Sequence, residues 1–140
     1  MTDPCDDGPV NDPSVQWVGV CIDALDAAPV ANFYATLLGW EITATDGDAW
    51  FQLRDPAGGI GINVQGEPGY VPPIWPEQPT EQQKMLHFEV QVDDLDDAVE
   101  TAERAGGSQA AWQPPDRDRS RIRIVLDPAG HPLCLFLAGE

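Results

Sequence analysis

The sequence has few basic residues, only two histidines and no long hydrophobic run. Seven Lys and Arg residues stand against 24 Asp and Glu residues, so the formal charge of the 140-residue chain is −17 at pH 7. A surface of this charge repels phosphate backbones and anionic lipid, and we expect neither nucleic acid nor a membrane as a partner. No apolar segment approaches the roughly 20 residues that cross a bilayer. The excess of acid is best explained by solubility.

The sequence shows neither a disulfide framework nor several common catalytic motifs. Cys5, Cys21 and Cys134 are odd in number and far apart, so we predict free thiols and no disulfide framework. Residues 1–13 are polar, rich in Pro and Asp, and unlike a signal peptide, which favours a cytoplasmic location. The sequence also lacks a Ser/His/Asp order, a phosphate-binding glycine loop and zinc-ribbon spacing.

An internal repeat is the strongest positive feature. Gln16–Ala28 resembles Leu86–Ala98, and the turn Asp55-Pro56-Ala57-Gly58 recurs as Asp127-Pro128-Ala129-Gly130. A repeat of this length predicts two copies of one structural unit. At one informative position the second copy has His87 where the first has Trp17.

Each copy predicts a strand, a helix and three further strands. In the first, apolar residues alternate over Val15–Ile22, a helix capped by Asp26 ends at Gly39, and strands follow at Trp40–Ala44, Ala49–Arg54 and Ile60–Val64. In the second, we expect a strand at Leu86–Val92, a helix capped by Asp93 or Asp94, and strands near Gln109–Trp112, Ser120–Leu126 and Leu133–Leu137. We therefore predict one domain over residues 15–137, with modules at 15–65 and 85–137.

Two further segments flank these modules. Residues 1–14 have no periodicity and are predicted to form a disordered tail. Residues 66–84 form a proline-rich connection that holds Tyr70 and Trp75. A loop of this length is either a tether between modules or a lid over a ligand.

Two phrases in the sequence resemble a known superfamily. Asn32–Trp40 and Asp127–Pro132 are similar to common signatures of the vicinal oxygen chelate proteins, which include glyoxalase I, extradiol dioxygenases and the bleomycin and fosfomycin resistance proteins. Tyr70–Pro76 followed by Leu86–Glu89 resembles the branch called the glyoxalase-like domain. The resemblance implies an α+β fold, in which two βαβββ modules form a cupped mixed sheet with the helices on the outside.

In the metal-dependent members of this superfamily, the first and last strands of each module supply the ligands of a divalent ion. The first-strand positions here are Trp17 and His87, and the last-strand positions, counted from the two turns, are Ile62 and Cys134. Of these, His87 is a good ligand and Cys134 a soft one, so we expect the four-ligand site, and with it a metal cofactor, to be absent. An irregular site of His87, Glu89 and Cys134 stays open.

The alternation in the predicted strand of the second module points to a polar cavity. His87, Glu89 and Gln91 share one face, while Phe88 and Val90 take the other. Polar groups that face inward need partners, so the first face is expected to line a cavity rather than a packed core. Cys134 is either packing or, less simply, a nucleophile that His87 activates.

These observations support three hypotheses about function. The first is a protein that binds a small organic molecule between the modules, with His87 and Glu89 as the catalytic or orienting pair. Its other predicted ligand-binding residues are Trp17, Trp50, Gln52, Tyr70, Trp75 and Cys134. The second is a metal-dependent lyase, isomerase or dioxygenase with an atypical site, and the third is a non-catalytic interaction module. A homodimer is expected in each case.

Two local features are expected to have no role in ligand binding. The basic cluster Arg117, Arg119, Arg121 and Arg123 is interleaved with Asp116 and Asp118, which favours a charged hairpin over a binding patch. His131 belongs to a turn and is expected to be exposed.

Overall fold

The computed structural model describes residues 14–139. The predicted disordered tail, apart from Ser14, and the predicted free thiol of Cys5 lie outside the described residues. Within them, the α+β class and the two βαβββ modules are confirmed. No helix in the described part of the chain is both long and apolar enough to span a membrane.

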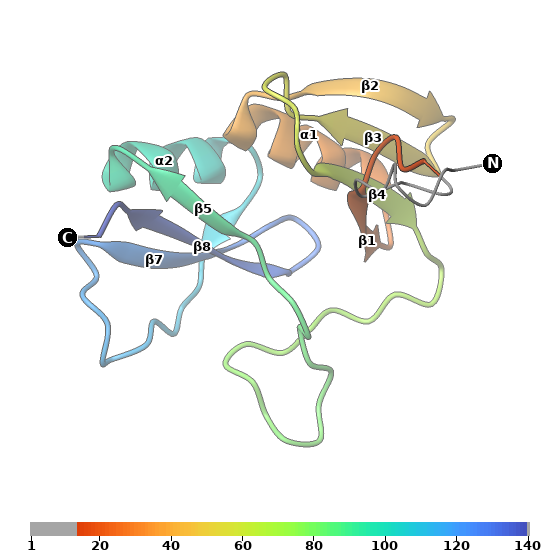
Figure 1. Cartoon of the computed structure of the whole chain (residues 1–140). Helices are drawn as coiled ribbons and strands as arrows, with labels where there is room; N and C mark the ends of the chain where they lie inside the picture. Colours follow the sequence, from red (N-terminus) through yellow and green to blue (C-terminus); the bar gives the residue numbers. More distant parts are fainter. Residues whose placement is uncertain (1–13, 140) are drawn as a thin grey trace, which may run out of the picture.

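The elements follow the repeat in the sequence (Figure 1). The first module contains β1 (Gly19–Ala24), α1 (Ala27–Leu38), β2 (Glu41–Asp46), β3 (Trp50–Arg54) and β4 (Gly61–Gly66). The second contains β5 (Glu89–Val92), α2 (Leu95–Arg104), β6 (Ser108–Gln109), β7 (Ile122–Leu126) and β8 (Pro132–Leu137). The connection between them runs from β4 to β5 as a long excursion below the two sheets in Figure 1.

The two helices begin and end for identifiable reasons. Gly39 ends α1 in the left-handed conformation, with φ 69°, and its N–H donates to the carbonyl of Ala35. Asp94 caps α2 by accepting a bond from the Asp97 N–H at 3.0 Å. Asp26 occupies the corresponding position before α1, but its side chain makes no capping bond. The start of α1 therefore depends on burial of its apolar face rather than on a cap.

Each module forms its own four-stranded sheet. The strand orders are β1-β4-β3-β2 and β5-β8-β7-β6, with a parallel first pair and antiparallel pairs thereafter. Across residues 14–139, no strand pairing joins the two sheets. Consequently β1 and β5 are edge strands.

One hydrophobic core serves both modules. Its buried residues come from α1, α2 and the helix-covered face of each sheet. Tyr34 of α1 reaches into the second module, where its hydroxyl donates to Asp127 Oδ2 at 2.7 Å and its ring meets Phe88 edge-on. The helix-covered face of each sheet is buried in this core. The opposite face of each sheet, called the open face below, does not contribute to it.

Candidate functional site

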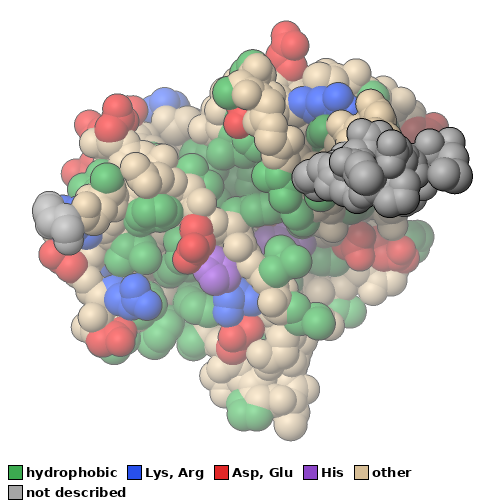
Figure 2. Space-filling model, in the orientation of Figure 1, with side chains coloured by type: hydrophobic (Ala, Val, Ile, Leu, Met, Phe, Trp, Pro, Cys, Tyr) green, Lys and Arg blue, Asp and Glu red, His purple; other side chains and the backbone are tan. Residues whose placement is uncertain are grey.

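A cavity of about 320 Å³ lies on the open face of the second sheet. Its floor is formed by β7 and β8, and its walls by the connection, the start of β5 and the loop before β7. The lining residues are Trp75, Lys84, His87, Glu89, Gln113, Pro114, Asp116, Arg117, Arg119, Ile122, Ile124, Pro132, Leu133 and Cys134. Hydrophobic side chains gather on this face beside acidic, basic and histidine side chains (Figure 2).

Three of the predicted site residues converge in this cavity. Glu89 lies opposite Cys134 in the parallel pairing of β5 and β8, and His87 precedes Glu89 on the same face. Donor atoms of the three side chains all lie within 4.8 Å of one another. His87 Nε2 is 3.6 Å from Glu89 Oε2, which is within ion-pair range but longer than a normal hydrogen bond. The side chains of His87 and Glu89 are 32% and 67% exposed, so both are accessible to a ligand.

Cys134 forms part of the apolar floor. It is buried with Ala110 and Ile124, and Trp75 and Ile122 pack against this small cluster. Burial, followed by the nearby charge of Glu89, raises the pKa of the Cys134 thiol. A raised pKa keeps the thiol protonated, which favours the packing interpretation over an activated nucleophile.

Trp75 brings the connection to the cavity, as the lid hypothesis requires. Its indole Nε1 donates to the carbonyl of Trp112 at 3.2 Å, and the two rings meet edge-on with centroids 5.7 Å apart. Lys84 lies over the Trp75 ring, with Nζ 5.1 Å from the centroid, and pairs with Glu77 Oε1 at 2.9 Å. These contacts hold one wall of the cavity in place.

Gln113 fixes the wall that the loop before β7 forms. Its amide bridges the loop to the sheet, donating to the carbonyls of Ala110 and Ile124 and accepting from the Ile124 N–H. The cavity also includes Gln113, Arg117 and Arg119, which the sequence patterns did not predict as site residues. The cluster of arginines in the sequence could have indicated a binding site, whereas a single glutamine in a loop gives no such indication.

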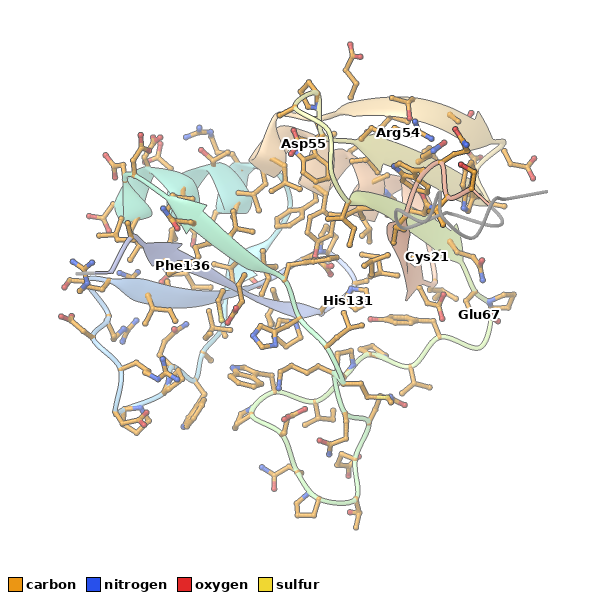
Figure 3. All side chains as sticks on the ribbon, viewed as in Figure 1. Cys21, Arg54, Asp55, Glu67, His131 and Phe136 are labelled. Atoms are coloured by element: carbon orange, nitrogen blue, oxygen red, sulfur yellow. The ribbon has the colours of Figure 1, made fainter. Side chains whose placement is uncertain are left out.

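Tyr70 lies in a second cavity of about 340 Å³, which adjoins the first at His87. Its hydroxyl donates to the carbonyl of Ala129 at 2.6 Å and lies 3.4 Å from His131 Nε2. Burial raises the pKa of Tyr70 to about 12. Figure 3 labels His131 at the β7–β8 turn, Cys21 on β1 and Glu67 at the start of the connection, and all three line this second cavity.

His131 is less exposed than predicted because it belongs to a buried network. Its Nδ1 lies 2.7 Å from Asp127 Oδ2, and Asp127 is only 4% exposed. The same carboxylate accepts from Tyr34 and from the backbone N–H groups of Ala129 and His131. This turn therefore joins α1, the connection and the second sheet.

The remaining predicted ligand residues, Trp17, Trp50 and Gln52, lie on the first module, outside the two cavities that adjoin His87. The Trp17 ring covers Gly19 and Gly61, where an added Cβ would lie 2.3 and 2.1 Å from ring atoms. The Arg54 guanidinium stacks on Trp17, 4.7 Å from the ring centroid. Trp17 and Arg54 therefore cover part of the open face of the first sheet, which was predicted to line a cup shared by both modules.

Ile62 was assigned to the wrong face. It is 4% exposed within the core, while its neighbour Asn63 lies opposite Cys21 and Gln52 on the open face. The turn between β3 and β4 spans residues 55–60, one residue longer than the turn at 127–131. A shift of one residue moves a strand position to the opposite face, so Asn63, not Ile62, corresponds to Cys134.

The ligand set of the metal-dependent relatives does not fit this chain. In the first module Cys21 pairs with Asn63 as Glu89 pairs with Cys134, so the position that corresponds to His87 is Gly19, which has no donor side chain. Trp17, predicted as the counterpart of His87, lies two residues earlier and covers Gly19 with its ring. Asn63 offers an amide in place of a carboxylate, and its Oδ1 is buried with no hydrogen-bond partner among the described residues. An ion that prefers several converging imidazole and carboxylate ligands gains little from these positions. Among residues 14–139, only the second module brings together three or more side chains of His, Cys, Asp or Glu that could hold a metal ion.

Comparisons with known proteins agree with the repeat and the fold. Residues 19–136 match the model of the glyoxalase-like domain family. A glyoxalase/bleomycin resistance protein from Albidiferax ferrireducens has 16% identity, with 88% of this chain and 98% of that chain covered and a TM-score of 0.60. A possible glyoxalase from Bacillus cereus has 15% identity, with 88% and 99% covered and a TM-score of 0.60.

A third similar structure is a glyoxalase/bleomycin resistance protein/dioxygenase family enzyme from Burkholderia phytofirmans, with 16% identity, 85% and 95% of the two chains covered and a TM-score of 0.61. At these identities the likeness shows the fold. No curated protein matches the chain. The chain belongs to the glyoxalase-like domain family of the vicinal oxygen chelate superfamily.

Proposed function

We propose that the protein binds a small organic molecule in the cavity of the second module. The observation that carries this proposal is the pairing of His87 and Glu89 above an apolar floor in a cavity of about 320 Å³. Cavities that bind small molecules combine apolar walls with a few converging polar groups, as this one does. His87 would orient a ligand oxygen by hydrogen bonding, and Glu89 would favour one tautomer of the imidazole ring.

A library of small organic molecules, screened by protein-observed NMR, tests the proposal. Ligands should shift the indole N–H signal of Trp75 and the imidazole signals of His87. Ile124→Glu places a charge in the cavity floor and should abolish binding, whereas Thr43→Glu, on exposed β2, should leave it unchanged. Binding that survives Ile124→Glu would place the ligand elsewhere and contradict the proposal.

One observation favours a second candidate, a metal-dependent lyase, isomerase or dioxygenase. The donor atoms of His87, Glu89 and Cys134 already lie within 4.8 Å of one another, and a thiol with an imidazole and a carboxylate suits zinc. The metal would have to displace a thiol proton that burial and Glu89 help to retain. Stoichiometric metal in protein purified without chelator, lost in His87→Ala, would replace the first candidate with this one.

Trp75 bears on the third hypothesis, a non-catalytic interaction module. That hypothesis needs the ring to be free to contact a partner protein. The ring instead packs on Trp112 and is covered by Lys84. Its contacts therefore support a role in the cavity wall.

We also propose a homodimer. β1 and β5 are edge strands. Val18, directly before β1, is 59% exposed, and Leu86, three residues before β5, is 57% exposed. Unpaired edges beside apolar side chains favour pairing with a second copy. Size-exclusion chromatography with light scattering should give twice the chain mass, and Leu86→Lys should reduce it. A wild-type monomer at tens of micromolar would contradict this proposal. The cytoplasmic location stays a prediction.

A further inference from the structure

We infer that the ligand of the second-module cavity is an organic anion, with a carboxylate group on an apolar body of aromatic size. This inference rests on the function proposed above and names the class of molecule that the cavity takes. The carboxylate would lie between Arg117 and Arg119, and the apolar body would lie on Ile124 and against Trp75.

The first support is where the scarce cations lie. The chain has only seven Lys and Arg residues and a formal charge of −17. Three of the seven, Lys84, Arg117 and Arg119, line this one cavity. Cations distributed without regard to function would be expected to pair with the abundant surface acids. Their presence around an apolar hollow raises the local potential where most of the surface repels anions.

The second support is that two of these cations are available to a ligand. Lys84 is engaged by Glu77 and by the Trp75 ring. Among residues 14–139, by contrast, the guanidinium groups of Arg117 and Arg119 have no hydrogen-bond or ion-pair partner. A guanidinium group binds a carboxylate through two parallel hydrogen bonds, and a pair of such groups can hold one carboxylate firmly.

The third support is that the backbone carrying these arginines is fixed. Asp118 Oδ1 accepts bonds from the Ser120 N–H and hydroxyl at 2.9 and 2.6 Å. The Arg123 guanidinium donates to the Arg119 carbonyl, with Nη2 at 2.6 Å. Asp118 and Arg123 therefore hold the backbone of this turn, and Arg117 and Arg119 line the cavity.

Two acidic residues in the lining, Asp116 and Glu89, oppose an anion. Glu89 lies beside His87, at 3.6 Å, and so at the imidazole end of the cavity. Arg117 is close enough to the floor to lower the pKa of Cys134, against the larger raising effects of burial and Glu89. A ligand with its acid group toward Arg117 and its apolar body toward Cys134 keeps the charge away from Glu89. Apolar walls also strengthen the attraction by excluding water.

Three ligands that share a naphthalene ring and carry a negative, a neutral or a positive group test the inference: 2-naphthoate, 2-naphthamide and 2-naphthylmethylammonium. Each is titrated into the full chain and followed by NMR at Trp75. We expect the naphthoate to bind roughly tenfold more tightly than the amide and the ammonium ion to bind most weakly. Raising the salt concentration from about 0.05 to about 0.5 M should weaken binding of the naphthoate alone.

The variants Arg117→Gln and Arg119→Gln locate the effect. Together they should weaken naphthoate binding by roughly tenfold or more and leave amide binding unchanged. Arg104→Gln, which removes one positive charge from exposed α2, is the control for each single variant and should change affinity less than about twofold.

The outcomes separate this inference from the proposed function. Equal affinity for the acid and the amide, or naphthoate binding that is insensitive to both arginines, overturns the inference and leaves the proposed function standing. Failure of all three ligands and of the wider library to shift Trp75 overturns both.

Discussion

Trp17 covers the open face of the first sheet, whereas His87 stands at the start of the open face of the second. Trp17 lies over Gly19 and Gly61, two positions without side chains, and Arg54 stacks on its outer surface. His87 instead lies over Cys134 and beside Glu89, within a cavity. Two copies of one architecture have thus diverged into a covered face and an open one, and the proposed binding site lies on the second.

The two Asp-Pro-Ala-Gly turns show the same divergence. Asp55 bonds locally, to the Ala57 N–H at 2.8 Å, at the surface position labelled in Figure 3. Asp127 is buried and bonds in addition to Tyr34 and His131. The same four residues therefore have different roles. The first turn connects two strands of one hairpin, and the second also makes contacts between the two modules.

The largest expected effect is on stability, when the buried Asp127 network of the second turn is removed. Asp127→Ala removes the acceptor of a buried tyrosine hydroxyl and three further bonds, and should lower the free energy of unfolding by about 3 kcal/mol or more. Asp55→Ala, the matched control, should cost less than about 1 kcal/mol because only local backbone bonds are lost. Urea unfolding of both variants measures the comparison, and equal losses would show that the Asp127 network does not stabilise the fold.

Substitution of Trp75 and of Trp17 compares the contributions of the two modules to ligand binding. Trp75→Ala removes one wall of the cavity, and we expect the affinity for 2-naphthoate to fall roughly tenfold. Trp17→Ala uncovers the first face and should leave that affinity within about twofold, at a cost of about 1–2 kcal/mol in stability. If Trp17→Ala weakened binding as strongly as Trp75→Ala, the first module would contribute to the site, as the cup hypothesis holds.

The stability of the protein at alkaline pH tests Tyr34 and Tyr70, both of which bond to residues of the second turn. Burial raises the pKa of Tyr70 to about 12 and that of Tyr34 well above its usual range. A raised pKa in the folded state means that the unfolded chain loses its protons first. Stability is therefore retained below pH of about 10 and falls as the pH rises from about 10 towards 12.

Tyr70→Phe should make this fall shallower, because one of the two linked protons is removed. Urea unfolding midpoints between about pH 9 and pH 11.5 measure it. The variant should also lose the bond to Ala129, so its stability at neutral pH should be lower by about 1 kcal/mol. Identical pH slopes in both proteins would show that Tyr70 is not protected in the folded state.

Much of the fold was predictable because periodicity and turn residues act locally. Alternation of apolar residues placed β3 and β7 to within two residues of their ends, and Gly39 marked the end of α1. His87, Glu89 and Cys134 could be brought together because they lie on a parallel pair within one module. Side-chain alternation carries that information without any knowledge of the tertiary fold.

The rest depended on long-range packing. The prediction of a cup between modules placed Trp50 and Gln52 in one site with His87, but neither lines the two cavities that adjoin His87. His131 was expected to be exposed because nothing near it in sequence, apart from Asp127 itself, indicates that Tyr34 and Tyr70 converge on the turn. Contacts across 93 and 61 residues are set by the fold as a whole.

The smallest expected effect concerns the error at Ile62. Deleting Gly59 gives the first turn the five-residue length of the second, which joins equivalent strands at 127–131. Because five residues suffice there, we expect the shortened turn to close without moving β4, so that Ile62 stays in the core and Asn63 on the open face. The free energy of unfolding should then change by less than about 1 kcal/mol. A loss of several kcal/mol would mean that the strand had slipped by one residue and turned Ile62 and Val64 towards solvent. In that case the extra residue is what holds the first face in its register.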